Sequence, residues 1–212
     1  MNIKQLAEQN YSRFYKLDGS EYIATGFAIY QINKIIKYFN VTSILELGLG
    51  IGSISDTVLK MAKNDSLKLR YVGTEANEFC KTALINNVEE YDKLEHLETL
   101  SQVGANNKFD LIIIDGLEGS LKEIITNCNP HSIIFIEGDR TPQRKLIMSI
   151  FPKAKHVNAI SLKKNKEQSH GNVNFFTGGG QLIFTNPNLK MKLYWFKEKV
   201  STYIKRYIRK FL

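Results

Sequence analysis

The sequence is poor in the residues that build metal centres and disulfide frameworks, and it has no long apolar run. Only two cysteines and four histidines occur among 212 residues. Cys80 and Cys128 are far apart and fall in segments that we expect to be helical, so neither a disulfide framework nor a cysteine metal site is supported. No apolar stretch reaches the ~18 residues that a membrane-spanning helix needs. The first residues also lack the basic-then-apolar layout of a secretory signal, and we expect a cytoplasmic protein.

The few histidines leave one candidate for acid–base chemistry. His96, His131 and His156 lie at or near the edges of expected strands, where surface and capping roles are common. His170 lies in the polar stretch KKNKEQSHGN between the last two expected strands, where a loop can approach a substrate. It is a candidate general base, although a solvated loop histidine is the commoner case.

Apolar periodicity alternates between strand and helix through most of the chain. With 43% hydrophobic and 24% charged residues, the chain can bury one well-formed core. Several expected strands are nearly continuous apolar runs, which belong in a sheet covered on both faces. Strands are expected near 43–47, 69–75, 95–100, 110–115, 132–137, 156–162 and 180–185, and helices over 53–63, 77–91, 118–127 and 142–150. The pattern predicts an α/β fold with a doubly wound, mostly parallel seven-stranded sheet.

A glycine-rich turn follows the first expected strand. The segment SILELGLGIGS places Gly48, Gly50 and Gly52 on alternate positions before a helix-like stretch. Glycine permits positive φ and close approach of a ligand to the backbone, and a tight turn with close helix packing is the less favoured alternative. The spacing differs from G-x-G-x-x-G, because Ser53 stands where the third glycine should be. Glu46 would repel a pyrophosphate and suits an amine-bearing or cationic ligand better.

Acidic residues end the next strands. Glu75 ends the second expected strand, where a carboxylate can accept hydrogen bonds from the two hydroxyls of a ribose. The alternative for Glu75 is a favourable charge in the first turn of the following helix. Asp115 ends the fourth strand, and Glu137 and Asp139 end the fifth. Ligands in such sheets bind outside the carboxyl ends of the strands, so these acids are site candidates.

Four segments together resemble the class I S-adenosylmethionine-dependent methyltransferases. They are ELGLGIG (46–52), YVGTEAN (71–77), FDLIIIDG (109–116) and SIIFIEGDR (132–140), and the resemblance covers about residues 40–186. It implies S-adenosylmethionine (SAM) as cofactor and methyl transfer as the activity. The implied cofactor contacts are Glu46, Gly48, Gly50, Gly52, Glu75, Ala76, Ser101 and Asp115.

For the reaction itself, the resemblance places Asp115 at the reacting centre, where it would bind the methionine amine, hold the acceptor or ligate a divalent metal. Glu137 and Asp139 would join it in an oxygen-rich cluster of the kind that suits magnesium. Gly138 separates the two fifth-strand acids, where related sugar and catechol O-methyltransferases have adjacent ones, and Arg140 can screen the charges instead. Magnesium is therefore an alternative that the sequence does not favour. We expect Asp115, Glu137, Asp139 and His170 to be the catalytic candidates.

The favoured reaction is O-methylation of a small-molecule, glycan-type or lipid-linked acceptor. No N-P-P-Y-type motif of amine methylation occurs, and the near-neutral core disfavours nucleic acid. Two other classes fit the same fold. One is a polyamine synthase or related transferase with an acidic pocket, and the other is a non-catalytic module that binds SAM without forming S-adenosylhomocysteine (SAH).

The ends of the chain form two further units around a domain over 40–187. Residues 1–39 read as one or two helices, and Tyr11, Arg13, Tyr15 and Tyr22 near their junction belong either to a lid over the substrate or to the structural framework.

Residues 188–212 carry eight basic residues and one acid, a net +7 of the +8 of the whole chain. Apolar residues recur there at helical spacing: Leu193, Phe196, Val200, Ile204, Tyr207 and Phe211. This basic amphipathic helix predicts binding to an anionic membrane surface at the inner face of the cell membrane. Packing on the domain, a homodimer contact and RNA binding remain alternatives.

Overall fold

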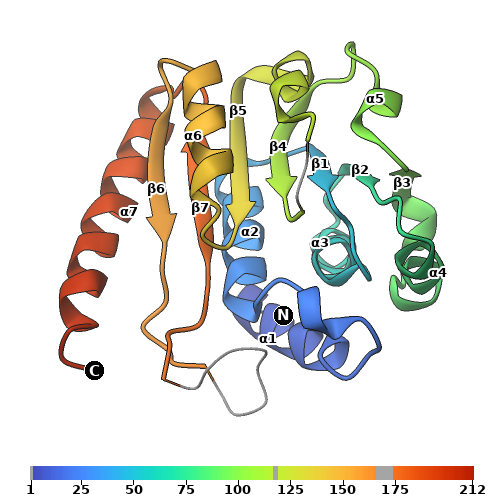
Figure 1. The fold of residues 1–212 in the computed structure, drawn as a ribbon, viewed down its shortest axis with the longest axis horizontal. Helices are drawn as coiled ribbons and strands as arrows, with labels where there is room; N and C mark the ends of the chain where they lie inside the picture. Colours follow the sequence, from blue (N-terminus) through green and yellow to red (C-terminus); the bar gives the residue numbers. More distant parts are fainter. Residues whose placement is uncertain (1, 117–118, 166–173) are drawn as a thin grey trace.

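Seven strands form one sheet in the order β3-β2-β1-β4-β5-β7-β6 (Figure 1). The computed structural model describes residues 2–116, 119–165 and 174–212. The strands are β1 (Ser43–Leu47), β2 (Arg70–Thr74), β3 (Leu94–Leu97), β4 (Phe109–Ile114), β5 (Cys128–Glu137), β6 (Lys155–Ala159) and β7 (Gly180–Phe184). The first five pair in parallel, and β7 runs antiparallel to both β5 and β6. The predicted mostly parallel seven-stranded sheet is therefore confirmed.

Helices cover both faces of the sheet because neighbouring residues of the central strands point to opposite sides. Ile44 and Leu111 belong to one buried cluster, and their neighbours Leu45 and Ile112 belong to the other. The first cluster lies under α2 (Gly26–Phe39), α3 (Ser53–Asn64), α4 (Glu78–Asn87) and α7 (Leu189–Ile208), with α1 (Ile3–Phe14) outside α2 and α3. The second lies under α5 (Leu100–Val103), the 3₁₀ helix η3 (Leu121–Asn127) and α6 (Thr141–Ile150). Two short 3₁₀ turns, η1 (Ser20–Tyr22) and η2 (Tyr91–Lys93), complete the fold.

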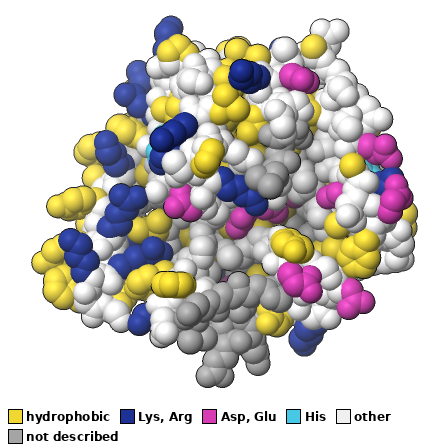
Figure 2. All heavy atoms as spheres, in the orientation of Figure 1, with side chains coloured by type: hydrophobic (Ala, Val, Ile, Leu, Met, Phe, Trp, Pro, Cys, Tyr) yellow, Lys and Arg dark blue, Asp and Glu magenta, His cyan; other side chains and the backbone are white. Residues whose placement is uncertain are grey.

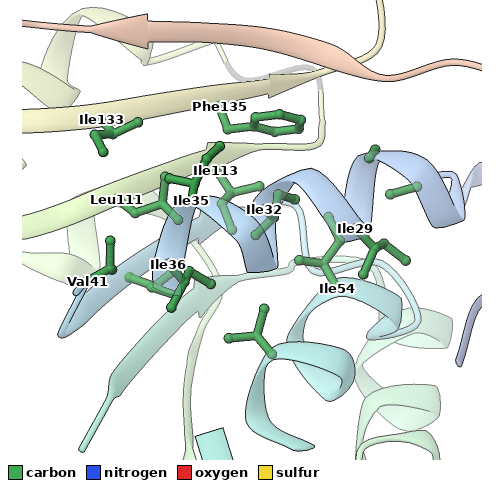
Figure 3. Packing of buried hydrophobic residues seen from close by; sticks show 14 of the residues in the cluster. Ile29, Ile32, Ile35, Ile36, Val41, Ile54, Leu111, Ile113, Ile133 and Phe135 are labelled. Carbon is green, nitrogen blue, oxygen red and sulfur yellow. The ribbon is translucent and has the colours of Figure 1, made fainter. Parts of the chain in front are cut away.

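The N-terminal helices are joined to the core of the sheet. Isoleucines of α2 pack on β4 and β5, and Figure 3 shows Ile32 and Ile35 facing Ile113 and Phe135. On α1, the Arg13 guanidinium lies 2.5 Å from the buried carboxylate of Asp56. It also donates a hydrogen bond to the Asn87 carbonyl at the end of α4. Burial of the apolar face and this ion pair fix the helices to the domain. Arg13 thus serves the framework.

Side-chain caps set the starts of the longer helices. The side chains of Asn2, Thr25, Asn77 and Asn188 accept hydrogen bonds from backbone N–H groups in the first turns of α1, α2, α4 and α7. Such caps satisfy donors that have no partner inside the helix, and each stabilises the helix by about 1 kcal/mol.

Two expectations for helices are wrong in detail. The helix expected over 118–127 is the 3₁₀ helix η3 among the described residues, and Cys128 begins β5 instead of lying in a helix. The helix expected over 77–91 ends at Asn87, and a short 3₁₀ turn follows it. These segments carry too few apolar residues at helical spacing to fix where a helix ends.

The C-terminal helix α7 packs along β6, on the same side of the sheet as α2 (Figure 1). Met191 and Tyr194 are buried in the core, and Thr202 donates a 2.6 Å hydrogen bond to the Asn158 carbonyl of β6. Lys34 of α2 forms a 2.7 Å ion pair with Glu198. Packing on the domain, one of the alternatives for this segment, is therefore part of the structure. No helix in the described part of the chain has the length and apolarity to cross a bilayer.

Candidate cofactor site

The predicted glycine turn lies at the edge of the sheet where the parallel strands end. The N–H groups of Gly48 and Leu49 both donate to the Thr74 carbonyl of β2, at 3.1 and 3.0 Å, so the turn is tied to the end of the neighbouring strand. Gly48 has φ +89°, and a Cβ there would lie 3.1 Å from the Gly116 nitrogen. Gly50 has φ +53°, and a Cβ there would meet nothing within 4 Å. The turn therefore leaves open space beside its backbone.

Glu75 is positioned next to this turn by the backbone on both sides of it. One of its carboxylate oxygens accepts from the Gly50 N–H, and the other accepts from the Asn77 N–H, each at 2.8 Å. The His96 Nε2 lies 3.0 Å from the Glu75 carbonyl oxygen, and its Nδ1 contacts the Tyr91 hydroxyl. The carboxylate thus stands at the end of β2 with its orientation set, as the ribose-binding prediction requires.

A cavity of about 230 Å³ opens between the turn and the N-terminal segment. Its walls come from four parts of the chain: the glycine turn, the start of α4, the connection between α1 and α2, and the end of β4. The lining residues are Gly19, Tyr22, Ile23, Leu49, Gly50, Ile51, Ser53, Asn77, Phe79, Cys80 and Asp115. Tyr22 and Phe79 are 89% and 52% exposed, so two aromatic rings stand at the cavity without a full partner. Flat, partly apolar ligands suit such walls.

Glu46 lies beneath the turn and outside the cavity lining. Its side chain is fully buried in β1, and the Tyr71 hydroxyl of β2 donates a hydrogen bond to one carboxylate oxygen. The other oxygen, Oε1, has no hydrogen-bond partner. Burial, with a smaller contribution from the Glu75 charge, raises the pKa of Glu46 to about 8, although the Tyr71 hydroxyl opposes the shift. The group is therefore mostly protonated at neutral pH.

Asp115 is the strand-end acid that reaches the cavity. Its Oδ1 is buried without a hydrogen-bond partner and lies 3.7 Å from Arg140 Nη2. Burial raises the pKa of Asp115 well above its usual value, the charges of Glu137 and Glu46 raise it further, and Arg140 opposes the shift. Burial likewise raises the pKa of Glu137, against the effect of Arg140. Burial and mutual repulsion thus favour the protonated forms of these carboxyl groups, and the single guanidinium opposes them.

The other predicted site residues lie apart from this cluster. Asp139 is exposed, and its carboxylate accepts a 3.2 Å hydrogen bond from the Thr141 hydroxyl at the start of α6. Ala76 is exposed beside Glu75, and Ser101 is exposed on α5, with its hydroxyl 2.9 Å from that of Thr99. Gly52 packs against α4, where a Cβ would lie 2.5 Å from Val88. His170 lies outside the described residues.

The Arg140 guanidinium lies beside two of the strand-end acids. Arg140 Nη2 lies 3.7 Å from both the Asp115 and the Glu137 carboxylates and donates to the Asp115 carbonyl at 3.2 Å. A guanidinium there supplies the positive charge that a metal ion would otherwise contribute. Over residues 2–116, 119–165 and 174–212, no three or more His, Cys, Asp or Glu side chains are grouped to hold a metal ion. The screening role of Arg140, left open by the sequence, is the one that the geometry supports.

Several residues of the site carry no local sequence signal. Gly19, Ile23, Phe79 and Cys80 line the cavity, and Tyr71 binds Glu46 from the neighbouring strand. Their roles depend on contacts between segments that are distant in sequence. Only the position of Phe79, just after the Asn77 cap that follows Glu75, could have suggested a cavity wall.

Comparison with known structures identifies the fold. An O-methyltransferase from Bacillus cereus in complex with SAH is 13% identical, with a TM-score of 0.60 over 86% of this chain and 91% of that one. An SAH-bound methyltransferase from Podospora anserina is 11% identical, with a TM-score of 0.61 over 86% and 88%. A putative O-methyltransferase from Klebsiella pneumoniae is 13% identical, with a TM-score of 0.59 over 88% and 91%. No protein-family model and no curated protein matches the sequence. The chain is thus similar in fold to methyltransferases of the class predicted from its motifs.

Proposed function

We propose that this protein is an enzyme that transfers a methyl group from SAM to an oxygen atom of a small-molecule acceptor. The observation that carries the proposal is the placement of Glu75 against the Gly50 N–H, at a cavity onto which Asp115 opens. The similar folds with SAH bound support the choice of cofactor. A glycan-type or lipid-linked acceptor is compatible with the same site.

Each polar group of the site has a role in this proposal. Glu75 would accept hydrogen bonds from the two ribose hydroxyls, as its carboxylate now does from two backbone N–H groups. The unpartnered Asp115 Oδ1 would accept from the methionine ammonium, whose positive charge offsets the cost of burying a carboxylate. Phe79 and Tyr22 would flank the adenine ring. The segment from Gly19 to Ile23 would then form the lid.

Bound SAM supplies an electrophilic methyl group on a positive sulfonium, and the protein must align an acceptor oxygen and remove its proton. The Asp115–Glu137 pair is suited to hold that proton, because burial raises the pKa of both carboxyl groups above their usual values. Arg140, 3.7 Å from both carboxylates, would stabilise the developing oxyanion and the pair together. We further propose a cytoplasmic location, in keeping with the free thiols of Cys80 and Cys128.

Replacing Glu75 with alanine should lower the affinity for SAH by about 100-fold, because two hydrogen bonds to a charged acceptor are lost. Thermal-shift titration and calorimetry with SAM and SAH measure this. Glu95→Ala is the matched control, since Glu95 is a β3 acid paired with Arg70 on the surface. Wild-type protein that binds neither compound would contradict the proposal. Binding without SAH formation from any phenol, catechol or sugar would indicate a non-catalytic module, and aminopropyl transfer to putrescine would indicate a polyamine synthase.

Methyl transfer should be unchanged by EDTA and by added magnesium, because Arg140 already lies between the Asp115 and Glu137 carboxylates. The measurement is SAH formation with the best acceptor of the panel, with and without chelator. Arg140→Met provides the contrast, since it removes the guanidinium and leaves the two acids free to bind a cation. Loss of activity in EDTA that magnesium restores in the wild type would show that a metal is needed.

A further inference from the structure

One face of the helix α7 packs on the domain, and its more apolar face points away from the domain. Met191, Tyr194 and Thr202 face the sheet and are buried. The opposite face carries a second set of apolar side chains that no described residue covers. We call this set the outer stripe, and it comprises Leu193, Phe196, Val200, Ile204, Tyr207 and Phe211, which are 43% to 72% exposed.

The outer stripe is continuous along the helix. At 100° per residue, its five members within α7 fall within one arc, and the buried residues Met191, Tyr194 and Thr202 fall on the opposite side. Phe211 follows just beyond the end of the helix. The rings of Tyr207 and Phe211 pack on each other at 5.1 Å between centroids, in an edge-to-face arrangement at the end of the stripe. A soluble helix that packs through one face normally presents polar residues on the other. Here the solvent-facing side is apolar over most of its length.

Basic side chains border the stripe on both sides. Helical spacing puts Lys197 on one flank and Lys192, Lys199, Arg206 and Lys210 on the other. The segment 188–212 carries a net charge of +7, while the rest of the chain carries +1. Figure 2 shows hydrophobic and basic side chains alternating along the edge of the molecule formed by α7 in Figure 1.

We propose that the outer stripe docks on the surface of an anionic bilayer. The aliphatic and aromatic side chains would enter the boundary between the headgroups and the acyl chains, and the flanking lysines would contact the anionic headgroups. A second copy of the chain fits less well, because two such faces would bring two strongly basic segments together. Nucleic acid fits less well, because leucine, valine and isoleucine at the centre of the stripe make no contact that phosphates favour.

Docking in this way would orient the cofactor site. The C-terminal end of α7 lies toward the edge of the sheet at which the parallel strands end (Figure 1). The cavity at that edge would therefore face along or toward the headgroup layer. The inference concerns attachment alone and does not depend on methyl transfer.

The test is flotation of the full-length protein with vesicles of phosphatidylcholine and with vesicles that also contain phosphatidylglycerol. We expect flotation with the anionic vesicles only, weakened by salt. The double variant Leu193→Gln/Ile204→Gln should lower the partition coefficient by about tenfold or more. Its control is Ile85→Gln/Ile125→Gln, two isoleucines 61% and 48% exposed elsewhere on the surface, against 61% and 50% for the tested pair.

A second pair of variants tests the charges. Changing Lys192, Lys197 and Lys210 to alanine should reduce anionic binding by about tenfold or more, and changing Lys68, Lys145 and Lys153, which are equally exposed, should not. Circular dichroism confirms that each variant is folded. Protein that ignores the anionic vesicles overturns the proposal. Undiminished vesicle binding by both Leu193→Gln/Ile204→Gln and the triple lysine variant would also overturn it. The same holds if the protein does not bind vesicles but sediments as a dimer that Leu193→Gln/Ile204→Gln dissociates.

Discussion

Replacing Gly50 with valine will abolish binding of SAM and SAH while leaving the protein folded. A Cβ at Gly50 would meet no protein atom within 4 Å, so the new side chain would project into the cavity that Gly50 lines. It would also displace the Glu75 carboxylate from the Gly50 N–H. We expect an affinity loss of more than about 100-fold by calorimetry, since both the space and the ribose acceptor are affected.

Gly104→Val separates the loss of space from the strain of the substitution. Gly104 has φ +76°, and a Cβ there would lie 3.7 Å from the nearest atom, on an asparagine side chain. The position therefore has open space, as Gly50 does, but it precedes β4 and does not line the cavity. A β-branched residue at positive φ costs about 1 to 3 kcal/mol, and Gly104, with ψ 140°, lies outside the left-handed helical region, so the strain there is at least as large as at Gly50. Both variants should lower the melting temperature by a few degrees. Equal SAH affinity in the two would contradict the assigned site.

Asp115→Asn should lower methyl transfer by about 100-fold or more and should raise the stability of the protein. Asp115 lines the cavity, and its carboxylate is buried near Glu137 and Glu46. Asparagine keeps the shape but can neither take the acceptor proton nor pair with an ammonium. Because burial raises the pKa of Asp115 in the folded state, its contribution to stability is present below its unfolded pKa and is lost as pH rises. The stability gain should therefore be larger at pH 8 than at pH 5.

Asp110→Asn, at the other end of β4, should lower the stability of the protein and leave methyl transfer unchanged. Burial would raise the pKa of Asp110, but hydrogen bonds from Thr42, Asn129 and Ser43 outweigh it and lower the pKa. Its contribution to stability is present above the unfolded pKa and is lost as pH falls. The variant should lose about 1 kcal/mol at neutral pH and keep its activity. Urea unfolding at about pH 3, pH 5 and pH 8 and SAH formation compare the two variants, and the stability deficit of Asp110→Asn should shrink only below pH 5. An active Asp115→Asn enzyme would refute the assigned role.

The sheet and the strand-end acids could be predicted because their signals are local. Buried parallel strands are continuous apolar runs, and parallel strands bring their carboxyl ends to one edge, so Glu75 and Asp115 converge without any knowledge of packing. The glycine turn could be predicted as well, since three glycines on alternate positions after a strand are typical of a turn that binds a ligand. These three facts were enough to predict the fold and the edge at which the cavity lies.

The rest of the site depends on contacts that sequence spacing does not encode. The hydrogen bond from Tyr71 to Glu46 joins neighbouring strands, and Arg140 reaches back to Asp115 across 25 positions. The cavity wall from Gly19 to Ile23 belongs to a segment whose place is fixed only by the packing of α1 and α2. Asp139, one residue from Arg140, turns instead to Thr141, because the backbone reverses after β5 to begin α6.

The tail shows why a periodic pattern can leave two outcomes open. The periodicity of α7 predicted an amphipathic helix without showing which of its faces meets the sheet. Tyr194 and Met191 are the buried ones because they fit beside α2 and β7, whereas Phe196 and Ile204 are left outside. Charge patterning identified the segment as unusual, and packing decided its orientation.

The order of the last three strands affects how the chain folds as it leaves the ribosome. Among the strands of the sheet, β6 is hydrogen-bonded to β7 alone, and β7 lies between β5 and β6. The chain nevertheless reaches β6 before β7. A nascent chain that ends before residue 180 therefore has a bare edge at β5 and an unanchored β6. The sheet can close only when β7 has emerged, and α7 then covers the seam. Until then the unpaired edge of β5 is open to chaperones.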